Sequence, residues 1–310
     1  MAETGPLFVS SGDLIADRRC NAALELAARG DLRAAADLLE QTVEIAPRFA
    51  TAWFALGSVR AQSGDRPGAI EAFTQASDAD PEDFHGARLE LARLKDGVAP
   101  MSQAYVRRLF DQYAARYDEA LTQNLDYRGP AVLLAAVEAA TAALGLPMRF
   151  GTALDLGCGT GLCGTAFRPF VGTLTGVDIA PAMIAKAQAK GPYDRLATAD
   201  LAEFLKGEAA GSYRLVIAGD VLVYISDATP IFAAVARVLS PGGVFACTVE
   251  SHEGSGVKLL PTLRYAYSAA HLRAMATAAG LDPVSLAPAS VRTEKGRPVP
   301  GLVLVARRTG

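Results

Sequence analysis

The ten residues 152–161, with the sequence TALDLGCGTG, constrain this chain more than any other stretch. Residues 153–156 are apolar apart from Asp155, as in a short strand covered on both faces of a parallel sheet. Glycines then leave a turn almost free of side chains, where positive φ costs little: Gly157, Gly159 and Gly161. Because the carboxyl ends of parallel strands open into a ligand crevice, we expect an α/β sheet with a ligand site at this turn.

Asp155 stands directly before the turn and indicates which ligand the turn suits. A carboxylate there repels a pyrophosphate and attracts a cationic group, such as an ammonium or a sulfonium. Residues 155–161 fill every place of E/D-x-G-x-G-x-G and so resemble the first motif of the class I S-adenosylmethionine (SAM) methyltransferases. Two other interpretations stay open here. One is an ordinary strand–turn–helix junction, and the other is a dinucleotide fingerprint, because residues 159–164 satisfy G-x-G-x-x-G.

A second segment, residues 176–184, resembles the G-x-D-x-S-x-x-M-I/L run of the same methyltransferases. Asp178 follows Gly157 by 21 residues, a spacing at which an acid after the second strand can bind two ribose hydroxyls. Dehydrogenases share this feature. The resemblance implies that Ile179 and Met183 flank an adenine ring.

A third acid, Asp200, follows an expected short strand at residues 195–199. The resemblance implies that it binds the adenine amino group, next to Leu201. Capping the helix that starts at Leu201 is an equally good and compatible role.

Residues 110–118, FDQYAARYD, resemble a segment that covers the cofactor in many small-molecule methyltransferases. It lies on an expected helix over residues 103–121. The resemblance implies that Tyr113 and Tyr117 face the methionine end of the cofactor. An aromatic stripe that only packs is the alternative. The full cofactor set that the resemblance implies is Tyr113, Tyr117, Asp155, Gly157, Cys158, Gly159, Gly161, Asp178, Ile179, Met183, Asp200, Leu201, Gly219 and Asp220.

The candidates for facing the reacting methyl group come from the ends of the fourth and fifth strands, expected at residues 213–220 and 244–249. Asp220 ends the fourth strand and Tyr224 follows it. His252 lies in residues 250–263, which we expect to form a mobile loop, and Tyr265 lies in a segment that resembles a pocket-closing region. None of the four is assigned as a base from sequence, and no cluster of metal ligands is expected.

The chain ends with two expected strands, residues 283–286 and 302–306, joined across a charged loop at residues 291–300. Such a pair gives the reversed antiparallel hairpin that separates this fold from a dinucleotide-binding domain. The resemblance therefore implies a doubly wound, Rossmann-like α/β sheet of seven mostly parallel strands.

The first hundred residues repeat themselves: Gly30, Ala35 and Pro47 recur as Gly64, Ala69 and Pro81, a period of 34 residues. The second copy matches the tetratricopeptide pattern W-x₂-L-G…A-x₃-F…P from Trp53 to Pro81. We expect a small all-α repeat domain at residues 13–95, a linker at 96–101, a lid region at 102–130 and a methyltransferase domain at 131–310. The repeats could dock a protein partner, form a homodimer or pack on the second domain.

Composition excludes several classes. The 310 residues are 51% hydrophobic and 20% charged with a net charge of −3, which is no electrostatic footprint for a nucleic acid. No apolar run reaches the length of about 20 residues that spans a membrane. The start of the chain lacks the basic and apolar regions of a signal peptide. Four scattered cysteines, without metal or redox spacing, fit buried thiols in a cytoplasmic protein.

The function expected from these features is SAM-dependent transfer of a methyl group to an O, N or C nucleophile. A small or carrier-bound acceptor is favoured, with direct displacement in a lidded pocket driven largely by proximity and orientation. Three alternatives remain: a protein methyltransferase guided by the repeats, a partner-binding protein with a non-catalytic domain, and an NAD-dependent oxidoreductase. Asp155 and the reversed hairpin argue against the last.

Overall fold

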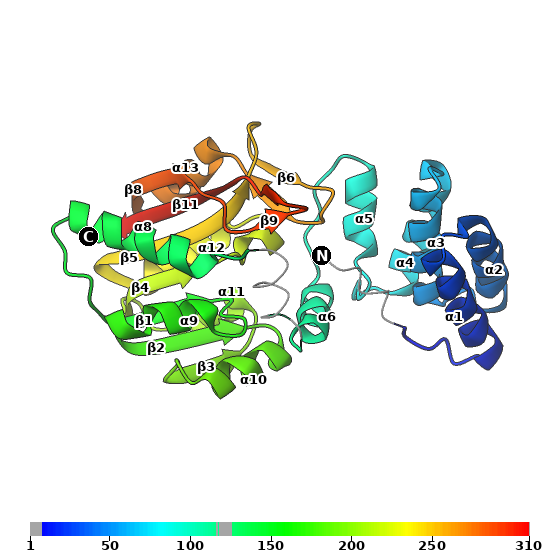
Figure 1. The fold of residues 1–310 in the computed structure, drawn as a ribbon, viewed down its shortest axis with the longest axis horizontal. Coiled ribbons are helices and arrows are strands. Elements are labelled where there is room, and N and C mark those ends of the chain that lie inside the picture. Colours follow the sequence, from blue (N-terminus) through cyan, green and yellow to red (C-terminus); the bar gives the residue numbers. More distant parts are fainter. Residues whose placement is uncertain (1–7, 116, 118–125, 310) are drawn as a thin grey trace. The chain divides into compact units, whose positions relative to one another are not determined.

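The computed structural model describes residues 8–115, 117 and 126–309, and the chain divides into two compact units, Met1–Tyr105 and Val106–Gly310. The first unit is helical and the second is built on a sheet (Figure 1). Within the described residues, no helix has the length and apolar character needed to cross a membrane.

The first unit consists of antiparallel helix pairs, as the repeat pattern predicts. Its helices are α1 (Leu14–Ala28), α2 (Leu32–Ile45), α3 (Ala50–Gln62), α4 (Arg66–Ala79) and α5 (Ala87–Leu94). Asp31 and Asp65 cap α2 and α4 by accepting bonds from backbone N–H groups of the first turn. Gly57 in α3 allows close helix contact, because an added Cβ would lie 2.7 Å from the Phe73 ring. Local turn chemistry and small residues thus produce the hairpins.

The second unit contains one sheet whose main path runs β3-β2-β1-β4-β5-β11-β8, with β6 and β7 off this path. Strands β1 to β5 pair in parallel, whereas β11 is antiparallel to both β5 and β8. This confirms the predicted doubly wound sheet with a reversed hairpin. The strands are β1 (Phe150–Leu156), β2 (Val171–Asp178), β3 (Arg195–Thr198), β4 (Tyr213–Ala218), β5 (Leu239–Ser251), β6 (Val257–Leu259), β7 (Tyr265–Tyr267), β8 (Leu281–Pro288) and β11 (Gly301–Arg308).

Helices cover the sheet because its strands are apolar on both faces. Leu133 of α8 packs with Leu215 and Ile217 of β4 in one core cluster. Phe232 of α12 packs edge-to-face on Phe245 of β5, with ring centroids 5.2 Å apart. The helical elements of this unit are α6 (Gln103–Tyr113), α8 (Gly129–Ala143), α9 (Leu162–Phe167), η2 (Arg168–Phe170), α10 (Pro181–Lys190), α11 (Leu201–Gly207), η3 (Leu222–Tyr224), α12 (Thr229–Val238) and α13 (Ala269–Ala278).

Two expectations about loops were wrong in part. Residues 250–263 are not one continuous loop: β5 continues to Ser251 and residues 257–259 form β6, which pairs with β7, whereas residues 252–256 and 260–263 lie outside strands. Glu250 is buried because arginines neutralise its charge, so its polarity was a poor guide to exposure. Residues 291–300 contain a small hairpin, β9 (Thr293–Glu294) with β10 (Arg297–Pro298), preceded by the buried Arg292.

The predicted helix over residues 103–121 is observed as α6 up to Tyr113. Residues 116 and 118–121 of that prediction lie outside the described residues. All four cysteines are buried free thiols, as expected.

Candidate functional site

The carboxyl ends of β1, β2 and β4 meet at one edge of the sheet. The parallel register sets Asp155 opposite Gly176 of β2 and Ile217 of β4. The glycine turn, Asp178 and Asp220 therefore follow neighbouring strands at the same edge, as the motifs predict.

The glycine turn needs its glycines for conformation and for space. Gly157, Gly159 and Gly161 have φ of 65°, 52° and 92°, a region that side chains disfavour. An added Cβ at Gly157 would also lie 2.3 Å from the Val221 side chain. The turn therefore presents bare backbone.

Asp178 holds the turn in shape. Its Oδ2 accepts the Gly159 N–H at 3.0 Å, and its Oδ1 accepts the Ala180 N–H at 2.9 Å. Burial raises the pKa of this carboxyl, and the two backbone bonds oppose that shift. A carboxylate has acceptor positions beyond these two bonds, so Asp178 can still accept hydroxyl donors.

Asp155 lies inside the protein, with 1% of its surface exposed, rather than open at the mouth of the turn. The hydroxyl of Tyr193 donates to its Oδ2 at 2.6 Å. Among the described residues, its buried Oδ1 has no hydrogen-bond partner. Burial raises the pKa of Asp155 to about 7, the Tyr193 bond opposes this, and the charge of Asp178 adds to it.

Asp220 occupies a strained corner after β4, with φ of 58°. Its N–H donates to Thr248 Oγ1 at 2.8 Å, which fixes the corner against β5. At Gly219 an added Cβ would lie 2.7 Å from Cys163 Sγ, so the preceding position must stay small. A strained acid at such a corner is typical of a functional site.

Asp220 belongs to a buried group of charges, here called the ion network: Asp220, Glu250, Arg264, Arg292 and Glu294. Arg292 lies 3.4 Å from Asp220 and 3.4 Å from Glu294, and it contacts Glu250. Arg264 lies 3.4 Å from Glu250 and 3.6 Å from Glu294. The side chains of Arg292, Glu250 and Arg264 are 1%, 3% and 7% exposed. Buried charges persist only when paired in this way.

An aromatic group adjoins the ion network. The Arg264 guanidinium lies 5.7 Å from the centroid of the Tyr224 ring, and Phe110 of α6 packs edge-to-face on the same ring at 5.0 Å. Burial raises the pKa of Tyr117 well above its usual value, helped by Tyr224 and by the charge of Asp220. The predicted lid segment thus contacts residues that follow β4.

The same segment also contacts the adenine side of the predicted site. Asp111 Oδ1 accepts the Ala182 N–H of α10 at 3.0 Å. Ala114 packs on Ala180 and the fully buried Met183, with Tyr113 and Tyr117 against this cluster. Residues 110–114 and Tyr117 therefore connect the regions that follow β2 and β4.

The remaining predicted residues have these places. Ile179 is half-buried after β2. Asp200 caps α11, which begins at Leu201, by accepting the N–H groups of Ala202 and Glu203. Its adenine role stays a prediction.

His252 is engaged within its own loop. Its Nδ1 accepts the Gly254 N–H, and its Nε2 lies 3.1 Å from the Gly256 carbonyl oxygen. Tyr265 is completely buried in β7, and its neighbour Arg264 is the residue that reaches the ion network.

Sequence reasoning missed Tyr193, Arg264 and Arg292. Glycines could have indicated Tyr193, because an added Cβ at Gly164 or Gly176 would lie 2.4 Å or 2.9 Å from its ring. The two arginines had no local signal for burial, because Glu250 lies 14 residues from Arg264 and Asp220 lies 72 residues from Arg292; Glu294 alone is close to Arg292 in sequence. Within the described residues, no group of three or more His, Cys, Asp or Glu could hold a metal ion.

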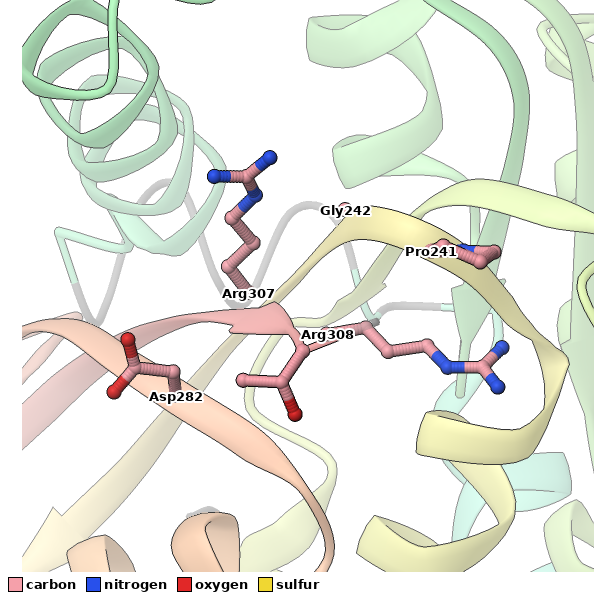
Figure 2. Close-up of a pocket in the computed structure, with 6 residues that line it drawn as sticks. Pro241, Gly242, Asp282, Arg307 and Arg308 are labelled. Atoms are coloured by element: carbon pink, nitrogen blue, oxygen red, sulfur yellow. The ribbon is translucent and has the colours of Figure 1, made fainter.

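A surface hollow at the opposite edge of the sheet carries none of these residues. It is lined by Pro241, Gly242, Asp282, Arg307, Arg308 and Thr309. Figure 2 shows the two arginines leaving β11 in different directions. Arg308 donates to the Leu239 carbonyl, so it serves to hold the strand end.

Comparison with known families agrees with this geometry. Residues 154–247 match the methyltransferase domain family, and residues 26–94 match the tetratricopeptide repeat family. Human methyltransferase-like protein 27 is 30% identical over 166 residues, covering 53% of this chain and 64% of that protein. The ubiquinone biosynthesis O-methyltransferase of Xanthomonas oryzae pv. oryzae is 32% identical over 93 residues, covering 29% and 39%. The chain thus spans less than two thirds of either relative.

Solved structures share the fold of the second unit. The 1,6-didemethyltoxoflavin-N1-methyltransferase of Burkholderia thailandensis, with bound 1,6-didemethyltoxoflavin and S-adenosylhomocysteine (SAH), has a TM-score of 0.51 at 22% identity, covering 69% of this chain and 93% of that one. Magnesium protoporphyrin IX methyltransferase of Synechocystis PCC 6803, with bound SAH, has a TM-score of 0.50 at 20% identity, covering 67% and 99%. Residues 154–247 therefore match a methyltransferase domain, the second unit shares its fold with solved methyltransferases, and residues 26–94 match a tetratricopeptide repeat.

Proposed function

We propose that this chain is a SAM-dependent methyltransferase that methylates an O, N or C nucleophile of a small or carrier-bound acceptor. The observation that supports this most is the joint placement of the glycine turn, Asp155, Asp178 and Asp220 at one edge of the sheet. When bound, SAM would supply a methyl group on a sulfonium: the nucleophile forms a bond to this carbon as the carbon–sulfur bond breaks, and SAH is the leaving group.

The residues present fit that cofactor. The bare backbone of the turn leaves room for the methionine part, and Asp155 has a buried oxygen without a partner among the described residues. In the proposed arrangement Asp155 balances the ammonium charge, Asp178 accepts the ribose hydroxyls, and Ile179 and Met183 flank the adenine. Asp200 and Leu201 lie at its far end, with Gly219 near the methionine. Tyr113 and Tyr117 cover the site.

The acceptor is proposed to lie beside Asp220 and Tyr224. Transfer then depends mainly on holding the nucleophile in line with the methyl group. For a hydroxyl acceptor, Asp220 takes the proton as the oxygen lone pair forms the new bond to carbon. Burial raises the pKa of Asp220, while Arg292 and Arg264 lower it. His252 is the weaker candidate base because its ring nitrogens contact its own loop.

Cofactor binding is tested by calorimetric titration of the purified chain with SAH and with NAD. We expect SAH to bind and NAD not to bind. The Asp178→Asn variant should bind SAH at least about tenfold more weakly, because it loses a charged acceptor for the ribose. Asp282→Asn, in the hollow at the opposite edge, is the matched control. Binding of NAD without SAH would refute the proposal.

Catalysis is tested by transfer of labelled methyl from SAM to a fractionated extract of the source cells. For a hydroxyl acceptor we expect Asp220→Asn to slow transfer by about 10²-fold or more with little change in SAH affinity. Unchanged transfer by this variant would remove Asp220 from the proton step while leaving the methyltransferase proposal intact.

A protein acceptor presented by the repeat unit is the second candidate, favoured by the tetratricopeptide match at residues 26–94. The same extract separates the two: label in the small-molecule fraction supports the first proposal, and label in the protein fraction supports the second. Binding of SAH without transfer to either fraction would favour a partner-binding protein with a non-catalytic domain.

A further inference from the structure

We propose that Tyr193 is a positioning residue, which orients the Asp155 carboxylate and keeps it charged for the cationic end of the cofactor. This inference rests on the proposed function. No motif of the cofactor site includes Tyr193, which lies between α10 and β3.

The Tyr193 ring is built into the glycine turn and its surroundings. Its hydroxyl donates to Asp155 Oδ2 at 2.6 Å. An added Cβ would lie 3.2 Å from the ring at Gly161, 2.4 Å at Gly164 and 2.9 Å at Gly176. Glycines on the turn, on α9 and on β2 therefore all accommodate this ring. Packing of the ring against these three glycines fixes the position of the hydroxyl beside Asp155.

The surroundings of Asp155 make this hydroxyl important. The titratable groups that act on Asp155, or on which it acts, are Tyr193, Asp178, Cys158, Cys163 and Tyr127. None of them is a cation. The backbone N–H of Gly164 also favours the charged form. In the part of the chain that the structure describes, Tyr193 is thus the side chain whose hydrogen bond stabilises the charge of a carboxylate with 1% of its surface exposed.

Removing the hydroxyl alone separates this role from packing. In Tyr193→Phe the ring keeps its seat, but Asp155 loses its side-chain donor, and its pKa rises further. A bond from a hydroxyl to a charged group corresponds to a pKa change of about one unit. Because burial already raises the pKa of Asp155 to about 7, the variant would have a largely neutral Asp155 at neutral pH.

The test is the affinity for SAH measured by calorimetry at several pH values. From pH 8 to pH 6, wild-type affinity should fall about tenfold as Asp155 takes up a proton. Tyr193→Phe should bind about fivefold more weakly than wild type at pH 7, and the difference should nearly vanish at pH 9. Comparing the two proteins at one pH cancels the titration of SAH itself.

A matched control is present in the chain. The Tyr213 hydroxyl donates to Glu208 Oε2, also at 2.6 Å, on a part of the sheet that holds none of the site residues. Tyr213→Phe should bind SAH as wild type does at every pH. A loss of affinity in Tyr193→Phe that is the same at pH 7 and pH 9 would mean that the hydroxyl does not act through the charge of Asp155, and it would overturn the inference.

A double variant decides whether Tyr193 acts through Asp155. Asp155→Asn should bind weakly without the pH dependence, and adding Tyr193→Phe should change its affinity by less than about twofold. Independent, additive losses would overturn the inference. If wild type itself failed to bind SAH, the proposed function would fail first. Wild-type binding with an unaffected Tyr193→Phe would instead reject the positioning role alone.

Discussion

At the scale of single residues, the ion network is the most unusual feature of this protein. Arg292 contacts three acids from separate segments while its side chain is 1% exposed. A buried pair of this kind adds little net stability over apolar residues, but removing one partner leaves buried charge uncompensated. The network therefore fixes the geometry around Asp220 more than it strengthens the fold.

Replacing Arg292 tests this reasoning. Arg292→Met should lower the free energy of unfolding by about 3–5 kcal/mol, because three acids would then share Arg264 alone. Urea unfolding at pH 7 measures the loss. Arg297→Met, on the exposed β10 strand of the same hairpin, is the control and should change stability by less than about 0.5 kcal/mol. Equal losses in both variants would contradict the assignment of the network.

Asp155 predicts a stability that depends on pH. Its pKa of about 7 in the folded state exceeds the usual 3.8, so the folded protein binds a proton that the unfolded chain has released between these values. The contribution of Asp155 to the free energy of unfolding is therefore fully present below about pH 4. It is lost as the pH rises toward 7, because the folded protein must then bury a charged carboxylate. Asp155→Asn should therefore stabilise the protein by about 2–4 kcal/mol at pH 8.

The check is urea unfolding of this variant and wild type at pH 8 and pH 4.5. The increase in the free energy of unfolding caused by Asp155→Asn should be much smaller at pH 4.5, because wild-type Asp155 is then neutral in the folded protein. A gain of the same size at both pH values would show that burial of a charged Asp155 is not its cause.

At the scale of elements, the turn after β1 depends on how closely α9 and β2 approach it. The Tyr193 ring occupies the space that a side chain at Gly164 of α9 would fill. Gly164→Ala should destabilise the protein by about 1–3 kcal/mol through overpacking, and it should weaken SAH binding because the ring must move. Gly207→Ala in α11 is the control, since an added Cβ there meets nothing within 4 Å. Thermal unfolding of both variants, with and without SAH, measures their stability and their SAH binding. Equal changes in Gly164→Ala and Gly207→Ala would contradict this prediction.

The elements show how far local sequence can predict structure. The glycine turn and two of the strands beside it were predicted to within a few residues: β1 was expected at residues 153–156 and is Phe150–Leu156, and β4 was expected at 213–220 and is Tyr213–Ala218. Apolar runs bounded by glycine and acid encode them locally. The segment after β5 was predicted as one loop, but it contains β6, which pairs with β7. This pairing joins Val257–Leu259 to Tyr265–Tyr267, and no alternation of apolar and polar residues long enough to predict a strand marks either three-residue run.

At the scale of the whole molecule, the chain divides after Tyr105 into two compact units. The predicted linker at residues 96–101 remains a prediction. Lys95, Asp96, Gly97 and Val98 are exposed and lie after the end of α5, which is the kind of segment that proteases cut first. Limited trypsin should therefore cleave first after Lys95, as judged by mass spectrometry of early fragments. First cleavage after the half-buried Arg60 would argue against this boundary.

The sequence alone determined the class of sheet, the repeat unit and the order of acids along the sheet edge. Each of these follows from contacts close in the chain or from a fixed spacing, as with Asp155, Gly157 and Asp178. Only the tertiary structure decided the surroundings of those acids. Tyr193 reaches Asp155 across 38 residues, and Arg292 reaches Asp220 across 72. Buried polar groups take whichever partner the fold brings near, and no local pattern records that partner.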